Sequence, residues 1–202
     1  DKDGVSLQKS LNSYGVKFSD ITDVILTHLH FDHCGGGTME RNGKIEPAFT
    51  HAKYYLQKAN LETASHPNIR ERSSYFSANY QPLLDSNVLT LLNGQVDDFL
   101  PGISALVSNG HTHGHQMLKI SDRANTILYC GDLVPTSSHV RLAWLMGYDL
   151  DPLTLIEEKQ KILGLAADNK WYLYFEHDPY CDAALIARNG NDFQVQQRFK
   201  FG

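Results

Sequence analysis

The chain carries the stretch THLHFDHCGG at residues 27–36, and this stretch decides how the rest of the sequence is interpreted. Three histidines and one aspartate fall within six residues, directly after the β-branched, apolar run Asp23–Thr27. Such a run is typical of a short buried strand, and alternate side chains of a strand or extended turn share one face. We therefore expect His28 and His30 to point the same way, while the following glycines allow the chain to turn tightly.

Imidazole and carboxylate ligands favour zinc, with iron, manganese or cobalt as alternatives. A solvated polar loop is the competing interpretation. Four potential ligands at this spacing, directly after an apolar strand, make that interpretation the weaker one. The stretch therefore predicts a metal site.

The spacing of residues 28–33, HLHFDH, resembles the HxHxDH signature of the metallo-β-lactamase superfamily. Three later segments resemble further elements of that family in the same order. GHTHGH at residues 110–115 resembles its GHTxGH element, CGD at 130–132 resembles the strand end with a bridging aspartate, and FEHDP at 175–179 resembles the strand end with a ligand histidine. The resemblance implies an α/β protein with the αββα sandwich of that family.

The resemblance also implies a site for two divalent metal ions, zinc first, with iron or manganese as alternatives. It assigns His28, His30 and His111 to one metal and Asp32, His33 and His177 to the other, with Asp132 bridging them. Asp132 and His177 each follow an apolar strand candidate, the end of a strand where ligands of α/β proteins gather. Asp32 and Asp132 are the expected catalytic residues, beside a hydroxide that attacks a carbonyl carbon.

The whole chain, residues 1–202, is predicted to form one mixed α/β domain. Helices are expected at 5–14, ending at Gly15, at 51–60 and at 152–167, with short helices or an excursion over 61–85. Strands are expected near Phe49 and at 88–92, 103–108, 116–120, 126–130, 171–175, 183–186 and 193–199. Family members begin with an additional β-rich segment, so the N-terminal part of the family fold is expected to be missing before Asp1.

Several residues outside the ligand set are candidates for supporting roles. His115 either supports the site from behind the ligands or is an ordinary strand histidine. His113 is expected either as an ordinary loop residue or at the pocket rim. His139, Arg141 and Trp144 are candidate substrate contacts, and otherwise stabilise their loop. Trp144, Met146 and Tyr148 either line an apolar pocket or pack under the helix that follows, and core packing is the commoner fate of such residues. His51 and His66 are expected at the surface.

Composition excludes several classes of partner. The net charge of −5 and the pI near 6.0 argue against binding nucleic acid by phosphate neutralisation, and no apolar stretch is long enough to span a bilayer. The three widely spaced cysteines show no disulfide pattern, so the cytoplasm is the expected location. The expected partner is a small-molecule substrate, and a homodimer is left open.

The expected reaction is hydrolysis of an ester-like bond, foremost a lactone or other carboxylic ester. Pro135 stands where acyl-homoserine lactonases often have tyrosine, three residues beyond the bridging aspartate, which weakens a specific assignment to that group. The alternatives left open are a phosphotriesterase, a glyoxalase II-like thioesterase, a diiron redox protein and a non-catalytic metal-binding module.

Overall fold

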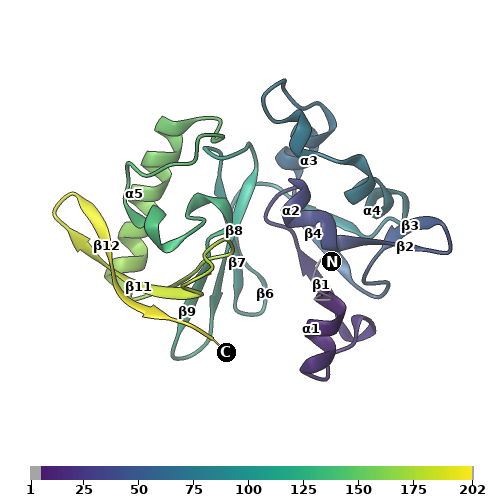
Figure 1. Cartoon of the computed structure of the whole chain (residues 1–202), viewed down its shortest axis with the longest axis horizontal. Coiled ribbons are helices and arrows are strands. Elements are labelled where there is room, and N and C mark those ends of the chain that lie inside the picture. Colours follow the sequence, from purple (N-terminus) through teal and green to yellow (C-terminus); the bar gives the residue numbers. More distant parts are fainter. Residues whose placement is uncertain (1–5, 202) are drawn as a thin grey trace. The chain divides into compact units, whose positions relative to one another are not determined.

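The computed structural model describes residues 6–201. The chain divides into two compact units, Asp1–Leu92 (unit 1) and Asn93–Gly202 (unit 2), each with its own sheet and apolar core (Figure 1). The expectation of a single domain over residues 1–202 stays a prediction.

Unit 1 is built on a three-stranded parallel sheet of order β1-β4-β5. Its helices and strands are α1 (Leu7–Ser13), η1 (Phe18–Asp20), β1 (Asp23–Ile25), α2 (Phe31–Cys34), η2 (Gly35–Gly37), β2 (Thr38–Arg41), β3 (Lys44–Pro47), β4 (Lys53–Gln57), α3 (Lys58–Ser65), η3 (Arg72–Ser74), η4 (Ser77–Asn79), α4 (Gln81–Asp85) and β5 (Leu89–Leu92). Leu29, Tyr54, Leu56 and Leu83 are fully buried in its core. The parallel sheet carries the end of β1, and with it His28, directly beside this core.

The first helix forms close to the predicted bounds. The Ser6 side chain accepts the Lys9 N–H and caps α1, and Gly15 follows the helix with a φ of +74°, a conformation that favours glycine. Val5, which belongs to the predicted helix, lies outside the described residues.

The helix predicted at residues 51–60 is wrong in its first half, because Lys53–Gln57 forms the strand β4. β4 is the central strand of the parallel sheet, and four of its five residues are buried. A short continuous apolar run does not distinguish a buried strand from a buried helix, and the two neighbouring strands decide the outcome.

The hairpin β2–β3 was not predicted, although the sequence contains its turn signal. Asn42 and Gly43 connect the two strands with φ values of 54° and 77°. Positive φ at both central residues is the requirement of a type I′ turn, for which Asn-Gly is the preferred pair. Figure 1 shows this hairpin extending from the rest of unit 1.

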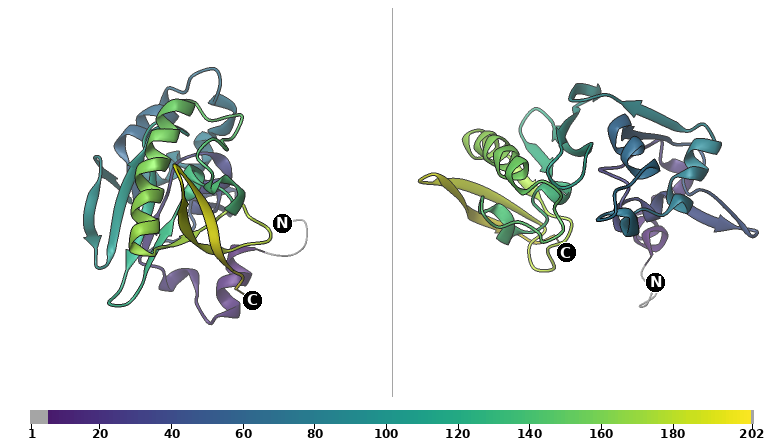
Figure 2. Two further views of the ribbon diagram at one scale, coloured as in Figure 1. Left: turned by 90° about the vertical axis from the view of Figure 1, so that its left-hand side faces the viewer. Right: turned by 90° about the horizontal axis from the view of Figure 1, so that it is seen from above.

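Unit 2 is built on a seven-stranded sheet of order β12-β11-β10-β9-β8-β7-β6, in which only β9 and β10 are parallel neighbours. Its elements are β6 (Val96–Leu100), β7 (Ile103–Ser108), β8 (His115–Ser121), β9 (Thr126–Tyr129), η5 (Gly131–Leu133), η6 (Ser137–Val140), α5 (Pro152–Asn169), β10 (Tyr172–Tyr174), β11 (Ala183–Asn189) and β12 (Asp192–Phe199). The helix α5 connects β9 to β10 and lies along one face of the sheet (Figure 2). Its buried residues Leu155, Ile162, Leu163 and Ala166 recur at helical spacing and pack on that face.

The strand β6 was missed because two aspartates interrupt its apolar pattern. Asp98 takes a φ of 50°, its N–H donates to Ser104 Oγ, and its carboxylate accepts the Gly102 N–H at 2.7 Å. β6 is therefore an irregular edge strand held by side-chain hydrogen bonds. Within residues 6–201, no helix has the length and apolar composition needed to cross a bilayer.

Candidate metal centre

In unit 1 the loop after β1 gathers the three histidines of the HLHFDH stretch. The His28 ring centre lies 4.5 Å from that of His30 and 4.1 Å from that of His33. His30 is the last extended residue before the short helix α2, whose first turn contains Asp32 and His33. Asp32 Oδ2 lies 3.6 Å from His33 Nε2. The turn into α2 thus brings all four predicted ligands of unit 1 into one cluster.

Buried polar contacts hold this loop in place. Asn60 of α3 accepts the Leu29 N–H at 2.8 Å, and both residues are fully buried. Thr27 Oγ1 lies 3.1 Å from His28 Nδ1, and the Cys34 thiol donates to the Leu29 carbonyl. Burial raises the pKa of Cys34 to about 12, so this cysteine stays a thiol and does not act as a nucleophile.

Glu71 is a second carboxylate beside the cluster, and no motif in the sequence indicates its position. Its Oε2 lies 3.6 Å from His30 Nε2 and accepts a hydrogen bond from the Tyr75 hydroxyl at 3.2 Å. The Asn68 amide donates to its other oxygen at 2.7 Å. These partners make a buried carboxylate tolerable and hold it against His30.

In unit 2 the Asp132 carboxylate lies between two imidazoles. Its Oδ2 is 3.2 Å from His111 Nε2 and its Oδ1 is 3.2 Å from His177 Nε2. His111 comes from the loop after β7, Asp132 from the turn after β9, and His177 from the loop after β10. One carboxylate oxygen of Asp132 therefore faces each of the two imidazoles.

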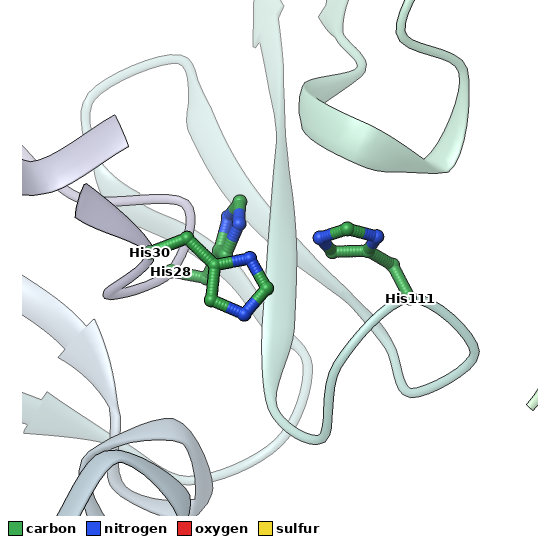
Figure 3. A group of neighbouring side chains, drawn as sticks. All are labelled: His28, His30 and His111. Carbon is green, nitrogen blue, oxygen red and sulfur yellow. The ribbon is translucent and has the colours of Figure 1, made fainter. Parts of the chain in front are cut away.

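Figure 3 shows His28 and His30 on the loop that follows β1, and His111 on the loop that follows β7. His111 and Asp132 are buried, whereas about a third of the His177 side chain is exposed. The five histidines and two aspartates of the predicted ligand set supply imidazole nitrogen and carboxylate oxygen donors, with no lysine or arginine among them. This donor chemistry fits divalent metal ions such as zinc.

His115 lies behind Asp132 at the start of β8. Its Nε2 accepts the Asp132 backbone N–H at 3.0 Å, and the side chain is fully buried. This contact holds the turn that carries Asp132. His113, in the same loop as His111, is exposed, as are His51 and His66.

Asp149 is the residue of unit 2 that sequence reasoning missed. Its Oδ1 lies 2.9 Å from His111 Nδ1 and its Oδ2 accepts the Met146 N–H at 2.7 Å. The side chains of Asp149 and His111 are both completely buried. The only local signal is the position of Asp149 just before the predicted helix, which does not indicate a contact 38 residues away.

The candidate substrate contacts lie on η6 and the segment after it. His139 is partly buried, its Nδ1 is 2.8 Å from Thr136 Oγ1, and burial, reinforced by the charge of Lys159, lowers its pKa. The Arg141 guanidinium lies 5.5 Å from the centre of the Trp144 ring. Both residues, with Arg198, line a shallow cavity of about 290 Å³.

Trp144 and Tyr148 are 49% and 59% exposed, so of the two alternatives left open for them core packing is wrong. A buried lysine holds their segment instead. Lys159 Nζ donates to the carbonyls of Arg141, Leu142 and Trp144 at 2.6, 3.3 and 2.8 Å. Burial lowers the pKa of Lys159 to about 8.

A mixed α/β fold with histidines and aspartates gathered at strand ends is the architecture of α/β metalloproteins. The family model of the metallo-beta-lactamase superfamily matches residues 5–177. The chain therefore belongs to this superfamily, and the family predicted from residues 28–33 is confirmed.

Relatives with known names and structures agree with this family. The N-acyl homoserine lactonase of Bacillus cereus is 33% identical over 170 residues, which cover 83% of this chain and 60% of the lactonase. The crystal structure of a probable metal-dependent hydrolase from Staphylococcus aureus matches with a TM-score of 0.84 and 28% identity, covering 98% of this chain and 71% of that one. An N-acyl homoserine lactone hydrolase with N-hexanoyl-L-homoserine at its catalytic metal centre matches with a TM-score of 0.66 and 26% identity, over 86% of this chain and 62% of the hydrolase.

These similarities confirm the predicted metallo-β-lactamase fold over nearly the whole chain. The chain spans 60% of the length of the Bacillus lactonases that it matches.

Proposed function

We propose that this chain carries the catalytic site of a dinuclear metal-dependent hydrolase that opens a lactone or cleaves a related carboxylic ester. The observation that carries the proposal is the Asp132 carboxylate, whose two oxygens face His111 and His177 at 3.2 Å each. The similarity to homoserine lactonases supports the choice of a lactone as the first substrate class.

The proposed ligands of the first metal are His28, His30 and His111, and those of the second are Asp32, His33 and His177, with Asp132 shared. Zinc is the proposed metal because imidazole and carboxylate donors suit it, and iron or manganese fits the same donors. Two such cations, when bound, activate water as a nucleophile and polarise the substrate carbonyl.

Residues of the chain position the ligands, transfer protons and contact the substrate in this proposed reaction. Asp132 holds one carboxylate oxygen toward each side of the site, and His115 fixes Asp132 through its backbone N–H. The Asp32 side chain is 45% exposed, so it can take a proton from the attacking water and transfer it to the leaving oxygen. His139, Arg141 and Trp144 are the proposed contacts to the part of the substrate away from the reacting bond.

The experiment combines metal analysis with a substrate panel. The panel contains an N-acyl homoserine lactone, an aryl ester, a phosphotriester and S-lactoylglutathione. We expect two equivalents of zinc, turnover of the lactone or ester above the other two, and loss of activity with a chelator.

His30→Ala and Asp132→Ala should lose metal and activity together, while the exposed-surface control His66→Ala should keep both. Full activity in metal-depleted Asp132→Ala would contradict the proposal. Faster turnover of the phosphotriester or the thioester would move the assignment to those classes, and redox-active iron with oxygen consumption would move it out of hydrolysis.

The proposed location is the cytoplasm, because the three cysteines Cys34, Cys130 and Cys181 are free and buried, as suits a reducing compartment. The proposed partner is the small-molecule substrate. Size-exclusion chromatography with light scattering would test whether the protein is also a homodimer.

A further inference from the structure

His111 and Asp149 form a buried pair, and the Asp149 carboxylate also accepts a hydrogen bond from a backbone N–H. The imidazole Nδ1 lies 2.9 Å from Asp149 Oδ1, and the other carboxylate oxygen accepts the Met146 N–H at 2.7 Å. Neither side chain is exposed to solvent. The carboxylate thus has a hydrogen-bond partner for each of its oxygens, which makes its burial tolerable.

The backbone around this pair is tied to the segment that precedes α5. Leu150 N–H donates to the His111 carbonyl at 3.2 Å, and Asp151 N–H donates to the Gly110 carbonyl at 2.9 Å. On α5 itself, the Glu158 carboxylate accepts hydrogen bonds from the Ser108 hydroxyl and from the backbone of Asn109 and Gly110. The loop of His111 and the segment of Asp149 are therefore fixed to each other by main-chain and side-chain bonds within unit 2.

We propose that Asp149 is a positioning residue that determines which nitrogen of His111 binds metal. Because the Asp149 carboxylate can only accept, the imidazole must carry a proton on Nδ1 to make the bond. Nε2, which faces Asp132 at 3.2 Å, then presents its lone pair on the side of the proposed metal. The inference rests on the proposed role of His111 as a ligand, and it adds a residue that the ligand motifs do not contain.

The same geometry predicts that asparagine does not substitute for Asp149. An asparagine amide has one acceptor oxygen and one donor NH₂ group, so it cannot accept from both His111 and Met146. Either the Met146 N–H loses its acceptor, or the amide donates to Nδ1. In the second case the proton moves to Nε2 and blocks the nitrogen that faces Asp132.

The test compares Asp149→Asn with Asp151→Asn in the full chain. Asp151→Asn removes the same charge two residues away, at the first turn of α5, where the Asp151 side chain accepts from Thr154 and where asparagine is also a good cap. Zinc affinity is measured by competition with a chromophoric chelator. We expect about 10- to 100-fold weaker binding of the first-site zinc in Asp149→Asn, the usual effect of losing such a support, and a change within about twofold in Asp151→Asn.

A second measurement does not depend on activity, and its main result comes from the wild-type protein. ¹⁵N NMR of the histidine-labelled wild-type protein, with His111 assigned through a His111→Gln variant, reports the protonation of each ring nitrogen. We expect a protonated Nδ1 in the zinc-free and zinc-loaded protein, and a zinc-dependent shift confined to Nε2. In Asp149→Asn we expect the proton on Nε2 or exchange between the two nitrogens.

Unchanged zinc affinity in a folded Asp149→Asn protein, or an unprotonated Nδ1 in the wild type, would overturn the inference. Either result leaves the proposed hydrolase intact, because metal content and substrate turnover are measured separately. Conversely, a protein that binds zinc through Nε2 but hydrolyses none of the substrates would remove the proposed function and keep the role of Asp149.

Discussion

Gly110 packs against the first turn of α5 so closely that even one additional carbon would collide with it. A Cβ added at Gly110 would lie 2.5 Å from the Leu155 backbone N, 2.5 Å from its Cα and 2.5 Å from its Cβ. Two of these three atoms are helix backbone and cannot rotate away. Gly110→Ala must therefore move the loop that carries His111 away from α5.

The expected cost follows from packing. Adding a carbon to a well-packed site costs about 1–3 kcal/mol, and rigid backbone neighbours place this site at the upper end of that range. The smaller conformational freedom of alanine in the unfolded chain offsets about 0.4–1 kcal/mol. We expect a net loss of about 2 kcal/mol in the free energy of unfolding, which lowers the urea midpoint by about 1 M.

The assay is urea unfolding followed by circular dichroism in a chelator, so that metal binding does not contribute to stability. Gly147→Ala is the matched control, because a Cβ at Gly147 meets no atom within 4 Å and its φ is not positive. This variant should unfold at the wild-type midpoint or slightly above it. Equal midpoints for Gly110→Ala and Gly147→Ala would refute the reasoning that the close approach to α5 holds the His111 loop.

Three further predictions concern buried polar groups. Burial lowers the pKa of Lys159 from 10.5 to about 8 in the folded protein, so between pH 8 and pH 10.5 the unfolded chain binds more protons than the folded one. The free energy of unfolding of the wild type, measured by urea unfolding at each pH and compared with that of Lys159→Met, should therefore rise by up to about 3 kcal/mol from pH 8 to pH 10.5. Asn60→Leu leaves the buried Leu29 N–H without its acceptor, so it should lower the free energy of unfolding by about 1–3 kcal/mol in the same assay and weaken zinc binding. Unchanged zinc affinity would show that this hydrogen bond does not position the loop. Because burial raises the pKa of Cys34 to about 12, its alkylation by iodoacetamide at pH 8, read by peptide mass spectrometry, should be at least about 100-fold slower in the folded protein than in urea.

Local sequence patterns were sufficient to predict much of unit 1 and most of the sheet in unit 2. The ligand cluster of residues 28–33 could be predicted because its members are close in sequence, so a strand followed by one turn brings them together. The strand β7 and the helix α5 follow from periods of two and of about 3.6 residues. The hairpin turn at Asn42-Gly43 also has a local sequence signal, although the hairpin was not predicted.

The features that local patterns did not predict are those that depend on neighbours in space. Residues 53–57 form a strand because β1 and β5 flank them, and hydrophobic periodicity alone does not distinguish that outcome from a helix. Lys159 lies on the buried face of α5, where a charge is unexpected. Only the folded chain provides the three carbonyl oxygens that make this position tolerable.

The sequence by itself determined the family, the strand-end placement of the ligand candidates and the residue types that suit a divalent metal. The tertiary structure decided which side chains support them, because those contacts join residues far apart in the chain. Asp149 lies 38 residues from His111, and Glu71 reaches His30 from a separate loop. A carboxylate carries no periodic or motif signal for such a contact, since its partner is fixed only when the strands and α5 have packed.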